Sequence, residues 1–448
     1  MTKIPIQTVN ISDLRRLRMI IKTKPSLTRL IILLIGALAF ISFLTFFVFK
    51  SPPVKVISSK VKSGGTSTGV SEIQTFFIST TESSSLSDID LQNIASHQIV
   101  LDFRTNFTTP QLARLRQLNA KIKVLKYINA GHVSSAWPDS SYNYIETNHS
   151  NWFLLDRNGR KVTRATNPNM HVLDPGNKEY QNWVADRALR KIDNGNDGIF
   201  ADVFYYPHYP PFMRYFYSSI PINPTTGQEY TLDEWTQAKE RLLSNLKEKL
   251  GGKILMANGY GTGGRYYQYG ARGLLNVTDG VLFEGFLRWG TDPLNFFRNE
   301  AQWRKDINAL QEASKSGKII GINTSFVVSA QDTPDAEKYK MYSLASFLLG
   351  MNYNSFYGLH PIDPERDIAF DSLSYPPTKK KIGKPLGNYY KAQNVYQRDF
   401  TGGKVLVNPT YNTQTLNLPR PYKTLEGGVV SEVALVHHTG MILLKTEE

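Results

Sequence analysis

The stretch that decides the fold is Asp197-Gly-Ile-Phe-Ala-Asp202-Val-Phe-Tyr-Tyr206. From Gly198 to Phe204 it is apolar except for one carboxylate, Asp202, close to its end. A short apolar run of this kind is typical of a parallel strand that is buried on both faces. An acidic residue at the carboxyl end of such a strand lies where barrel enzymes place their chemistry. Asp202 is therefore the first candidate catalytic residue.

A second stretch, Asp279-Gly-Val-Leu-Phe-Glu284-Gly-Phe, repeats this design and also ends its apolar run on one carboxylate, Glu284. Burying an unpaired carboxylate is costly, which disfavours an ordinary structural role for an acid after an apolar strand. Glycoside hydrolysis requires two carboxyl groups, one ionised as nucleophile or base and one protonated as acid. We therefore predict that Asp202 and Glu284 face one cleft as the catalytic pair.

The rest of the chain from about residue 74 alternates strand-like runs with amphipathic helix-like segments. The predicted strands are Gln98–Phe103, Ile122–Ile128, His171–Leu173, Gly198–Val203, Lys253–Ala257, Gly280–Phe283, Lys318–Ile322 and Leu348–Phe356, and the predicted helices are Thr109–Leu118, Asn177–Ile192, Leu232–Leu250 and Pro293–Ala313. Such alternation indicates a parallel sheet with helical crossovers. An open doubly wound sheet would usually show a glycine-rich turn after its first strand, and none is present. Residues 74–400 are therefore predicted to form a (β/α)8 TIM barrel, with Asp202 and Glu284 at the ends of its fourth and sixth strands.

From Thr401 the pattern changes to short strand-like runs separated by Pro, Asn and Gly turns. Runs of this kind are typical of antiparallel structure. Residues 401–448 are therefore predicted to form a small all-β domain.

The N-terminal region predicts a membrane anchor. Residues 30–49 form a run of 20 residues without a charge, and as a helix this run matches a bilayer core of about 30 Å. Seven basic residues precede it, so the positive-inside rule keeps residues 1–29 cytoplasmic. We expect a single-pass transmembrane signal anchor in the cell membrane, with everything after residue 50 extracellular. Residues 50–73, rich in Ser, Gly, Pro and Lys, are expected to be a flexible stalk.

Composition excludes several classes of function. The formal net charge is +14, but eleven of the 52 basic residues precede residue 73, and the remainder of the chain carries a balance of only +5. The basicity therefore belongs mostly to the membrane-proximal segment, and nucleic acid is not expected as a partner. The chain has no cysteine, which excludes disulfides and thiolate sites, and its histidines lack metal-ligand spacing. We expect no metal site and no cofactor.

Polar and aromatic side chains also end the neighbouring predicted strands. Amides, charges and flat aromatic faces at such a rim can orient sugar hydroxyls and rings. The predicted substrate-binding residues are Asp102, Lys126, Tyr127, Asn129, Asp174, Tyr205, Asn258, Trp289 and Asn323. Two of them have an equally good alternative, because Asp174 suits a helix cap and Asn258-Gly-Tyr-Gly suits a simple turn.

Four motifs together resemble a known family. They are "DGIFADVF" at 197–204, "ILMANGYG" at 254–261, "DGVLFEGFLRW" at 279–289, and the closing segment "GKVLVNPT…GMILL" between 403 and 444. In order and spacing they are similar to the glycoside-hydrolase-like TIM-barrel proteins, a group of hypothetical glycosyl hydrolases, over roughly residues 95–445. The resemblance implies a barrel, a small C-terminal β-domain and carbohydrate hydrolysis. A more distant likeness to the alpha-galactosidase clan implies that Asp202 is the nucleophile and Glu284 the acid/base.

The sequence therefore favours a membrane-anchored extracellular glycoside hydrolase whose substrate is a surface or environmental oligo- or polysaccharide. Two alternatives stay open. One is a non-catalytic barrel that binds glycans or organises the cell envelope, and it predicts binding that survives loss of either carboxylate. The other is a polysaccharide lyase or transglycosidase that uses the same cleft, and product analysis separates it from a hydrolase.

Overall fold

The computed structural model describes residues 73–446 except for the short ranges 138–140, 193–194, 203–216, 261–262, 269–270 and 364–367. The predicted cytoplasmic segment and the predicted anchor at 30–49 lie outside the described residues, as does nearly all of the predicted stalk. Within the described ranges, no helix is both long enough and apolar enough to cross a bilayer.

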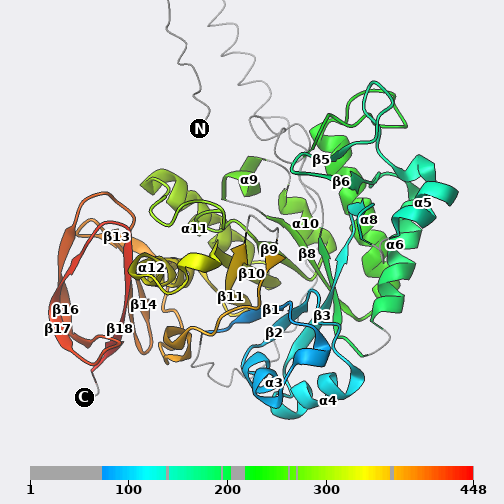
Figure 1. The fold of residues 1–448 in the computed structure, drawn as a ribbon. Coiled ribbons are helices and arrows are strands. Elements are labelled where there is room, and N and C mark those ends of the chain that lie inside the picture. The colour runs from blue at the N-terminus through cyan, green and yellow to red at the C-terminus, as the bar shows by residue number, and fades with distance from the viewer. Residues whose placement is uncertain are drawn as a thin grey trace, which may run out of the picture. The chain divides into compact units, whose positions relative to one another are not determined.

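The largest element of the fold is a parallel sheet that curves into a nearly closed barrel (Figure 1). Its eight parallel strands, in order, are β1 (Phe76–Ser79), β2 (Ile99–Asp102), β3 (Lys123–Asn129), β7 (Gly198–Asp202), β8 (Ile254–Tyr260), β9 (Gly280–Phe283), β10 (Ile319–Val327) and β11 (Ser355–Asp363). The last strand returns to the first, because the amide of Tyr357 donates to the carbonyl of Gln74 at 3.0 Å. The short β12 (Ile368–Ala369) pairs antiparallel with the end of β11. The predicted parallel barrel is confirmed in this form.

Three details of the predicted strands are wrong. The first barrel strand, β1, was not predicted, and the predicted strand His171–Leu173 is not part of the barrel. The apolar run that begins at Leu348 was also misassigned, because its first residues form the buried last turn of a helix. The first two errors offset each other, so Asp202 does end the fourth barrel strand and Glu284 does follow the sixth.

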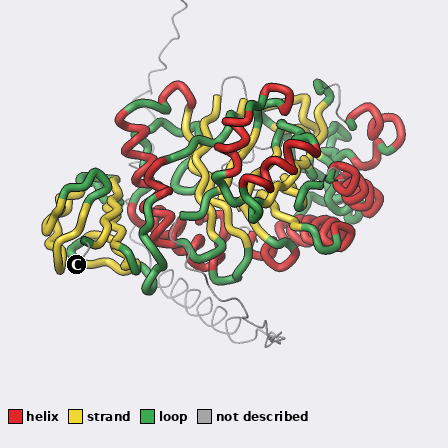
Figure 2. The backbone as a smooth tube through the Cα atoms, turned by 90° about the horizontal axis from the view of Figure 1, so that it is seen from below, coloured by secondary structure: helices red, strands yellow, loops and turns green. Residues whose placement is uncertain are grey.

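Helices surround the strands, as Figure 2 shows. They are α3 (Asp88–Ala95), α4 (Thr109–Leu118), α5 (Tyr142–Asn148), α6 (Lys178–Lys191), α8 (Leu232–Leu250), α9 (Gly263–Gln268), α10 (Leu274–Val277), α11 (Glu300–Ser314) and α12 (Pro334–Gly350). Capping boxes begin α4 at Thr108 and α8 at Thr231. The hydroxyl of each threonine accepts from the backbone amide three residues later, and the side chain of that later residue (Gln111 or Glu234) accepts from the backbone amide of the threonine. These local signals explain why the predicted bounds of α4 and α8 match the structure.

Alternate residues of each barrel strand face opposite sides. One set fills the lumen with apolar side chains, namely Phe76, Ile78, Ile99, Leu101, Leu125, Phe200, Met256, Leu282 and Phe356. The other set packs against the helices, as Val100 and Val124 do against α3 and α4. The lumen is therefore a packed core, and side chains that follow this apolar layer toward the carboxyl ends of the strands form the floor of any site there.

A small antiparallel sheet is inserted between β3 and β7. It consists of β4 (His132–Ser134), β6 (Asn167–Val172) and β5 (Thr163–Arg164), in that order. The segment His171–Leu173, predicted as a barrel strand, belongs to this insertion.

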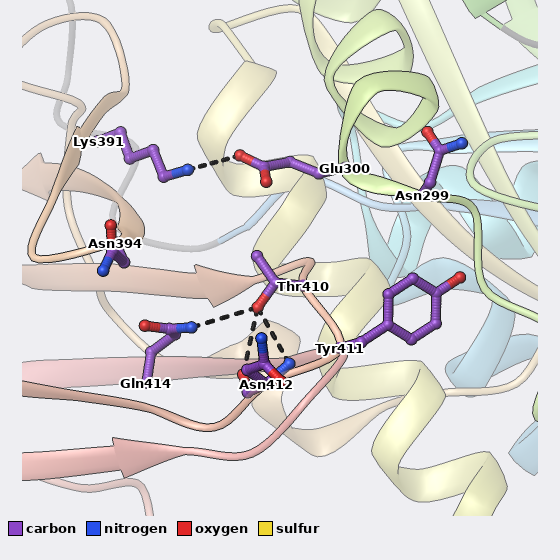
Figure 3. A pocket seen from close by; sticks show the side chains of 8 residues that line it. All are labelled: Asn299, Glu300, Lys391, Asn394, Thr410, Tyr411, Asn412 and Gln414. Carbon is purple, nitrogen blue, oxygen red and sulfur yellow. Dashed lines mark hydrogen bonds and ion pairs between the residues drawn. The ribbon is translucent and has the colours of Figure 1, made fainter.

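A second sheet follows the barrel in the chain. It has six antiparallel strands in the order β13 (Tyr390–Ala392), β14 (Val395–Phe400), β15 (Gly403–Asn408), β18 (Thr439–Lys445), β16 (Gln414–Lys423) and β17 (Val429–Leu435). Two of these strands precede Thr401, where the sequence pattern changes. Glu300 of α11 joins the sheet to the barrel layer, because it accepts from Lys391 and from Tyr396 at 2.6 Å each (Figure 3 draws Glu300 and Lys391).

Helix α12 lies between the barrel and this second sheet. Almost every residue from Tyr339 to Gly350 is buried, and the helix packs on β10 and β11 on one side and on β15 and β18 on the other. Gly440 of β18 lies so close that an added Cβ would fall 2.4 Å from the Cβ of Ala345. At its carboxyl end, Arg398 of β14 donates to the carbonyl oxygens of residues 348, 349 and 351 at 2.7 to 3.0 Å. The second sheet therefore both covers this helix and caps it.

Candidate functional site

The two predicted catalytic carboxylates are brought together at the carboxyl ends of β7 and β9. Between them lies Asn258 of β8, whose Nδ2 donates to Asp202 Oδ1 at 3.2 Å and to Glu284 Oε2 at 3.0 Å. Both bonds share one nitrogen, so these two carboxylate oxygens lie at most about 6.2 Å apart, the sum of the two bonds. Both carboxylates are only partly buried, and they therefore stay within reach of solvent or a ligand.

Tyr127 of β3 completes the surroundings of Asp202. Its hydroxyl donates to Asp202 Oδ2 at 3.0 Å, and its ring packs edge-on against Phe103 with 4.3 Å between centroids. Burial, reinforced by the charge of Asp202, raises the pKa of Tyr127 well above its usual value, so the hydroxyl keeps its proton. Each oxygen of Asp202 thus accepts from one neutral donor, and the carboxyl group is held in one orientation.

The electrostatics of the site separate Asp202 from an ordinary aspartate. Burial, with a further contribution from the charge of Glu284, raises the pKa of Asp202 from 3.8 to about 6. The hydrogen bonds from Tyr127 and Asn258 and the positive charge of Arg164 act in the opposite direction. Asp202 is therefore mostly ionised at neutral pH and takes up a proton near pH 6. A shifted carboxyl group beside a second carboxylate is typical of functional sites.

Arg164 was not among the predicted site residues. It lies in β5 of the inserted sheet, yet its charge lowers the pKa of Asp202 as well as those of Tyr127 and His132. The stretch around Arg164 has no apolar periodicity and no motif, so its position near Asp202 could not be predicted from the sequence. The insertion between β3 and β7 therefore contributes a positive charge to the site.

The end of β8 is irregular in a way that serves the site. Asn258 pairs with Leu282 and Tyr260 pairs with Phe283, which leaves Gly259 as an extra residue in β8. Such a β-bulge re-aims the side chains next to it and is frequent beside active sites. The predicted alternative of a simple turn at Asn258 is wrong, because the residue lies within the strand.

A buried ion pair fixes the loop after Glu284. Asp306 of α11 is 1% exposed, pairs with Arg298 and accepts from the backbone amide of Leu287 at 3.2 Å. Arg298 in turn donates to the carbonyl oxygen of Gly285 at 3.1 Å. The residue adjacent to Glu284 is therefore held from α11. Neither residue ends a predicted strand, so the pair was not among the predicted site residues.

Asp102 and Lys126 do not join the carboxylate pair. Their neighbours Leu101 and Leu125 fill the lumen, so Asp102 and Lys126 face the opposite, helix side of β2 and β3. Lys126 Nζ lies 3.0 Å from Asp102 Oδ1, with side chains 7% and 0% exposed. Asp102 also accepts from the amide of Asn106 at 2.8 Å. This placement gives the predicted substrate contact no support and assigns the pair to the packing between strands and helices.

Asn129 and Asp174 also have structural partners. Asn129 Oδ1 accepts from the amides of residues 131 and 132 at 3.0 and 2.8 Å, which forms the turn after β3. Asp174 is buried and accepts from the Tyr230 hydroxyl at 2.6 Å and from the amide of residue 176 at 2.8 Å. Burial raises its pKa. The alternative that Asp174 caps the next helix is wrong, because Asn177 is the N-cap of α6.

The remaining predicted binding residues differ in position. Asn323 of β10 is 3% exposed and lies beside Glu284, because Phe283 pairs with Ile322 and the next residue of each strand follows at the same height. Trp289 is partly buried in the loop after β9, where its amide donates to Asp292 at 2.9 Å. Tyr205 lies outside the described residues. Across the described parts of the chain, no group of three or more His, Asp or Glu side chains is arranged to hold a metal ion.

Comparison with known proteins agrees with the motifs. The model of hypothetical glycosyl hydrolase family 15 matches residues 116–404, which confirms the resemblance seen in the sequence. No curated protein matches the chain. Among solved structures, Amy13B of Eubacterium rectale is 12% identical with a TM-score of 0.50, over 85% of this chain and 97% of that chain. At this identity the likeness shows the fold alone.

Two further solved structures are similar at a lower level. The glycoside hydrolase domain of PelA from Pseudomonas aeruginosa is 12% identical with a TM-score of 0.44, over 67% of this chain and 98% of that chain. An alpha-galactosidase from Thermus thermophilus is 13% identical with a TM-score of 0.38, over 69% of this chain and 60% of that chain. Neither similarity is close enough to assign a residue or a substrate.

Proposed function

Because the chain belongs to hypothetical glycosyl hydrolase family 15, we propose that it is a glycoside hydrolase in which Asp202 and Glu284 carry the reaction. The observation that carries the proposal is the amide of Asn258, which bonds to both carboxylates and brings one oxygen of each within about 6.2 Å of the other. Both carboxylates remain partly accessible at the carboxyl ends of barrel strands, the face on which barrel enzymes bind substrate.

We further propose a retaining mechanism, which the close approach of one oxygen from each carboxylate supports. Carboxyl groups lie about 5–5.5 Å apart in retaining enzymes and about 6.5–9.5 Å apart in inverting ones, where a water must fit between them. The bonded oxygens of Asp202 and Glu284 are at most about 6.2 Å apart. In this mechanism one carboxylate attacks the anomeric carbon, while the other protonates the leaving oxygen and then activates the water that releases the sugar.

We assign Asp202 as the nucleophile and Glu284 as the acid/base. Hydrogen bonds from Tyr127 and Asn258 favour the ionised form of Asp202 and aim its oxygens, as a nucleophile requires. The raised pKa of Asp202 argues for the reverse assignment, but a pKa of about 6 still leaves most of this carboxyl group ionised at neutral pH. The two donors therefore support this assignment.

Azide rescue tests both the function and the assignment. Asp202→Asn and Glu284→Gln are each expected to lower kcat on aryl glycosides by about 10²–10⁴-fold. In Asp202→Gly and Glu284→Ala, whose shortened side chains leave room for the anion, azide should give a glycosyl azide of inverted configuration with the Asp202 variant and of retained configuration with the Glu284 variant. The matched control is Asp279→Asn, at the amino end of the same strand as Glu284, which should keep its activity. Full activity in either site variant would refute the proposal, and glycan binding without turnover in the unmodified protein would favour the non-catalytic alternative.

We also propose, from the sequence pattern, that residues 30–49 anchor the chain in the cell membrane and hold the barrel outside. The charge-free run and the basic residues before it support this location. A surface or environmental polysaccharide is the substrate that such a location offers. Protease added to intact cells should remove a C-terminal epitope tag, and protection of the tag would contradict the proposed orientation.

A further inference from the structure

Three polar residues of β10 and β11 face the barrel lumen above its apolar core. On β10, an added Cβ at Gly321 would meet Met256 and Leu282 of the core, so Asn323 and Ser325 face the same side. On β11, an added Cβ at Gly358 would meet the ring of Phe76, which is also in the core. His360, two residues further on, therefore faces the lumen as well.

The strand register places these residues next to the catalytic pair. Asn323 follows Ile322, which pairs with Phe283, and so lies level with Glu284. Ser325 pairs directly with His360 across β10 and β11. Asn323, Ser325 and His360 therefore continue from Glu284 around the carboxyl end of the barrel.

The polar atoms of this group are buried but incompletely bonded. Asn323, Ser325 and His360 are only 3%, 5% and 5% exposed. Asn323 Nδ2 donates to Ser325 Oγ at 2.9 Å, but neither Asn323 Oδ1 nor His360 Nδ1 has a hydrogen-bond partner among the described residues. Buried polar atoms are almost always hydrogen-bonded, so such exceptions point to a missing ligand or water.

Asn258 adds a third atom of this kind. Its Nδ2 bonds to two carboxylate oxygens, which fixes the orientation of the amide and leaves Oδ1 as the free end. No partner for this oxygen exists within the described residues, although Asn258 is only 6% exposed. The oxygen can only accept a hydrogen bond, so its partner must be a donor.

We propose that Asn258, Asn323, Ser325 and His360 form the subsite that holds the sugar ring to be cleaved, and that this ring is a neutral sugar bound through its hydroxyl groups. A hydroxyl both donates and accepts, so it can satisfy the oxygen of Asn258 and either orientation of Asn323. None of the four residues is a lysine or arginine, the side chains that usually pair with a carboxylate, so the carboxylate of a uronic acid would lose its hydration without gaining a charged partner. Burial lowers the pKa of His360 to about 4, so its ring is neutral at pH 7 and can likewise donate or accept.

This inference rests on the proposed function, and a binding measurement tests the subsite separately from the hydrolase activity. The full chain carrying Asp202→Asn and Glu284→Gln is titrated by calorimetry with neutral hexosides and with the matching uronides. Binding of a neutral glycoside, and weaker binding of the corresponding uronide, is expected. Adding His360→Leu or Asn323→Ala should weaken the neutral binding by about 10- to 100-fold, the range for one lost hydrogen-bond partner. His360→Gln, whose side chain can still donate and accept hydrogen bonds, should retain part of the affinity that His360→Leu loses.

Deoxy analogues locate the contact. A deoxy analogue that lacks the hydroxyl bound by His360 should bind the unmodified subsite more weakly than the parent sugar. In the His360→Leu variant, the deoxy analogue and the parent sugar should bind with equal affinity. Unchanged neutral binding in both subsite variants, with melting temperatures that show folded protein, would overturn the subsite. Tighter binding of the uronide would overturn the choice of a neutral sugar. If the unmodified protein turns over no glycoside but its binding depends on His360, the subsite stands and the hydrolase proposal fails.

Discussion

Replacing Asp202 with asparagine should stabilise the folded protein more at pH 8 than at pH 4 while strongly lowering its proposed activity. Folding raises the pKa of Asp202 from 3.8 to about 6, so the folded state binds this proton more tightly than the unfolded chain does. The cost of ionising the buried group therefore appears as pH rises from about 4 to 6 and is fully present above pH 6. At about 1.4 kcal/mol per pH unit, the shift corresponds to about 3 kcal/mol.

Asp202 is partly accessible to solvent, so screening reduces this cost to roughly 1–3 kcal/mol. The new amide cannot ionise, and its oxygen still accepts from the Tyr127 hydroxyl, but its NH2 group faces Asn258 Nδ2 and cannot accept from it. This lost hydrogen bond lowers the stability of the variant equally at both pH values. We therefore expect the change in the free energy of unfolding caused by Asp202→Asn to be more favourable at pH 8 than at pH 4 by that amount. Urea denaturation followed by tryptophan fluorescence at the two pH values measures both quantities.

The control for this experiment is Asp279→Asn, which removes a carboxylate that pairs with Lys247 at 2.6 Å. It should not stabilise the protein at either pH. An equal effect of Asp202→Asn on the free energy of unfolding at pH 4 and pH 8 would show that the ionised carboxylate of Asp202 is not the source of the cost.

Three further predictions concern the same site. The kcat/KM of the unmodified protein should fall as pH drops below about 6, because a nucleophilic Asp202 must be ionised; a fall above pH 6 instead would mean that Asp202 is the acid. Tyr127→Phe removes a hydrogen bond that lowers the pKa of Asp202, so the acidic limb of this profile should move to higher pH, and an unmoved limb would contradict the contact. Asp306→Asn leaves Arg298 buried without its charged partner, which should lower the free energy of unfolding by about 3–5 kcal/mol. The loop at Gly285 is then held less firmly, so kcat should decrease by a larger factor than KM changes. Thermal melting and steady-state kinetics check this last prediction, and a variant with unchanged melting and kcat would refute it.

Asp202 and Glu284 were predictable because each ends an apolar run, a pattern that can be recognised in a single sequence without an alignment. The side of the strand on which a residue lies was not predictable. Barrel strands are buried on both faces, so the usual alternation of polar and apolar residues is absent. Asp102 and Lys126, at the ends of their strands, were therefore grouped with Asp202 although they face the helices.

Other parts of the site required tertiary information. Ser325 was missed because the predicted strand Lys318–Ile322 ended before it, whereas β10 continues to Val327. His360 was missed because an apolar run at the end of α12 was assigned to the last strand. That helix is buried on nearly all sides, so it has no polar stripe that distinguishes it from a buried strand. Arg164 and Asp306 reach the site from an inserted sheet and from a helix, and no spacing in the sequence relates them to Asp202 or Glu284.

The position of α12 constrains the order in which the protein can fold during synthesis. This helix precedes the eighth barrel strand. One of its sides is covered only by strands that follow later in the chain, and Arg398, which caps its carboxyl end, also lies in one of these later strands. A nascent chain that has completed β11 therefore still exposes an apolar helix until β14, β15 and β18 have left the ribosome. The barrel and the second sheet should consequently fold as one cooperative unit, and a chain truncated before Tyr390 should depend on chaperones and aggregate rather than yield a smaller folded barrel.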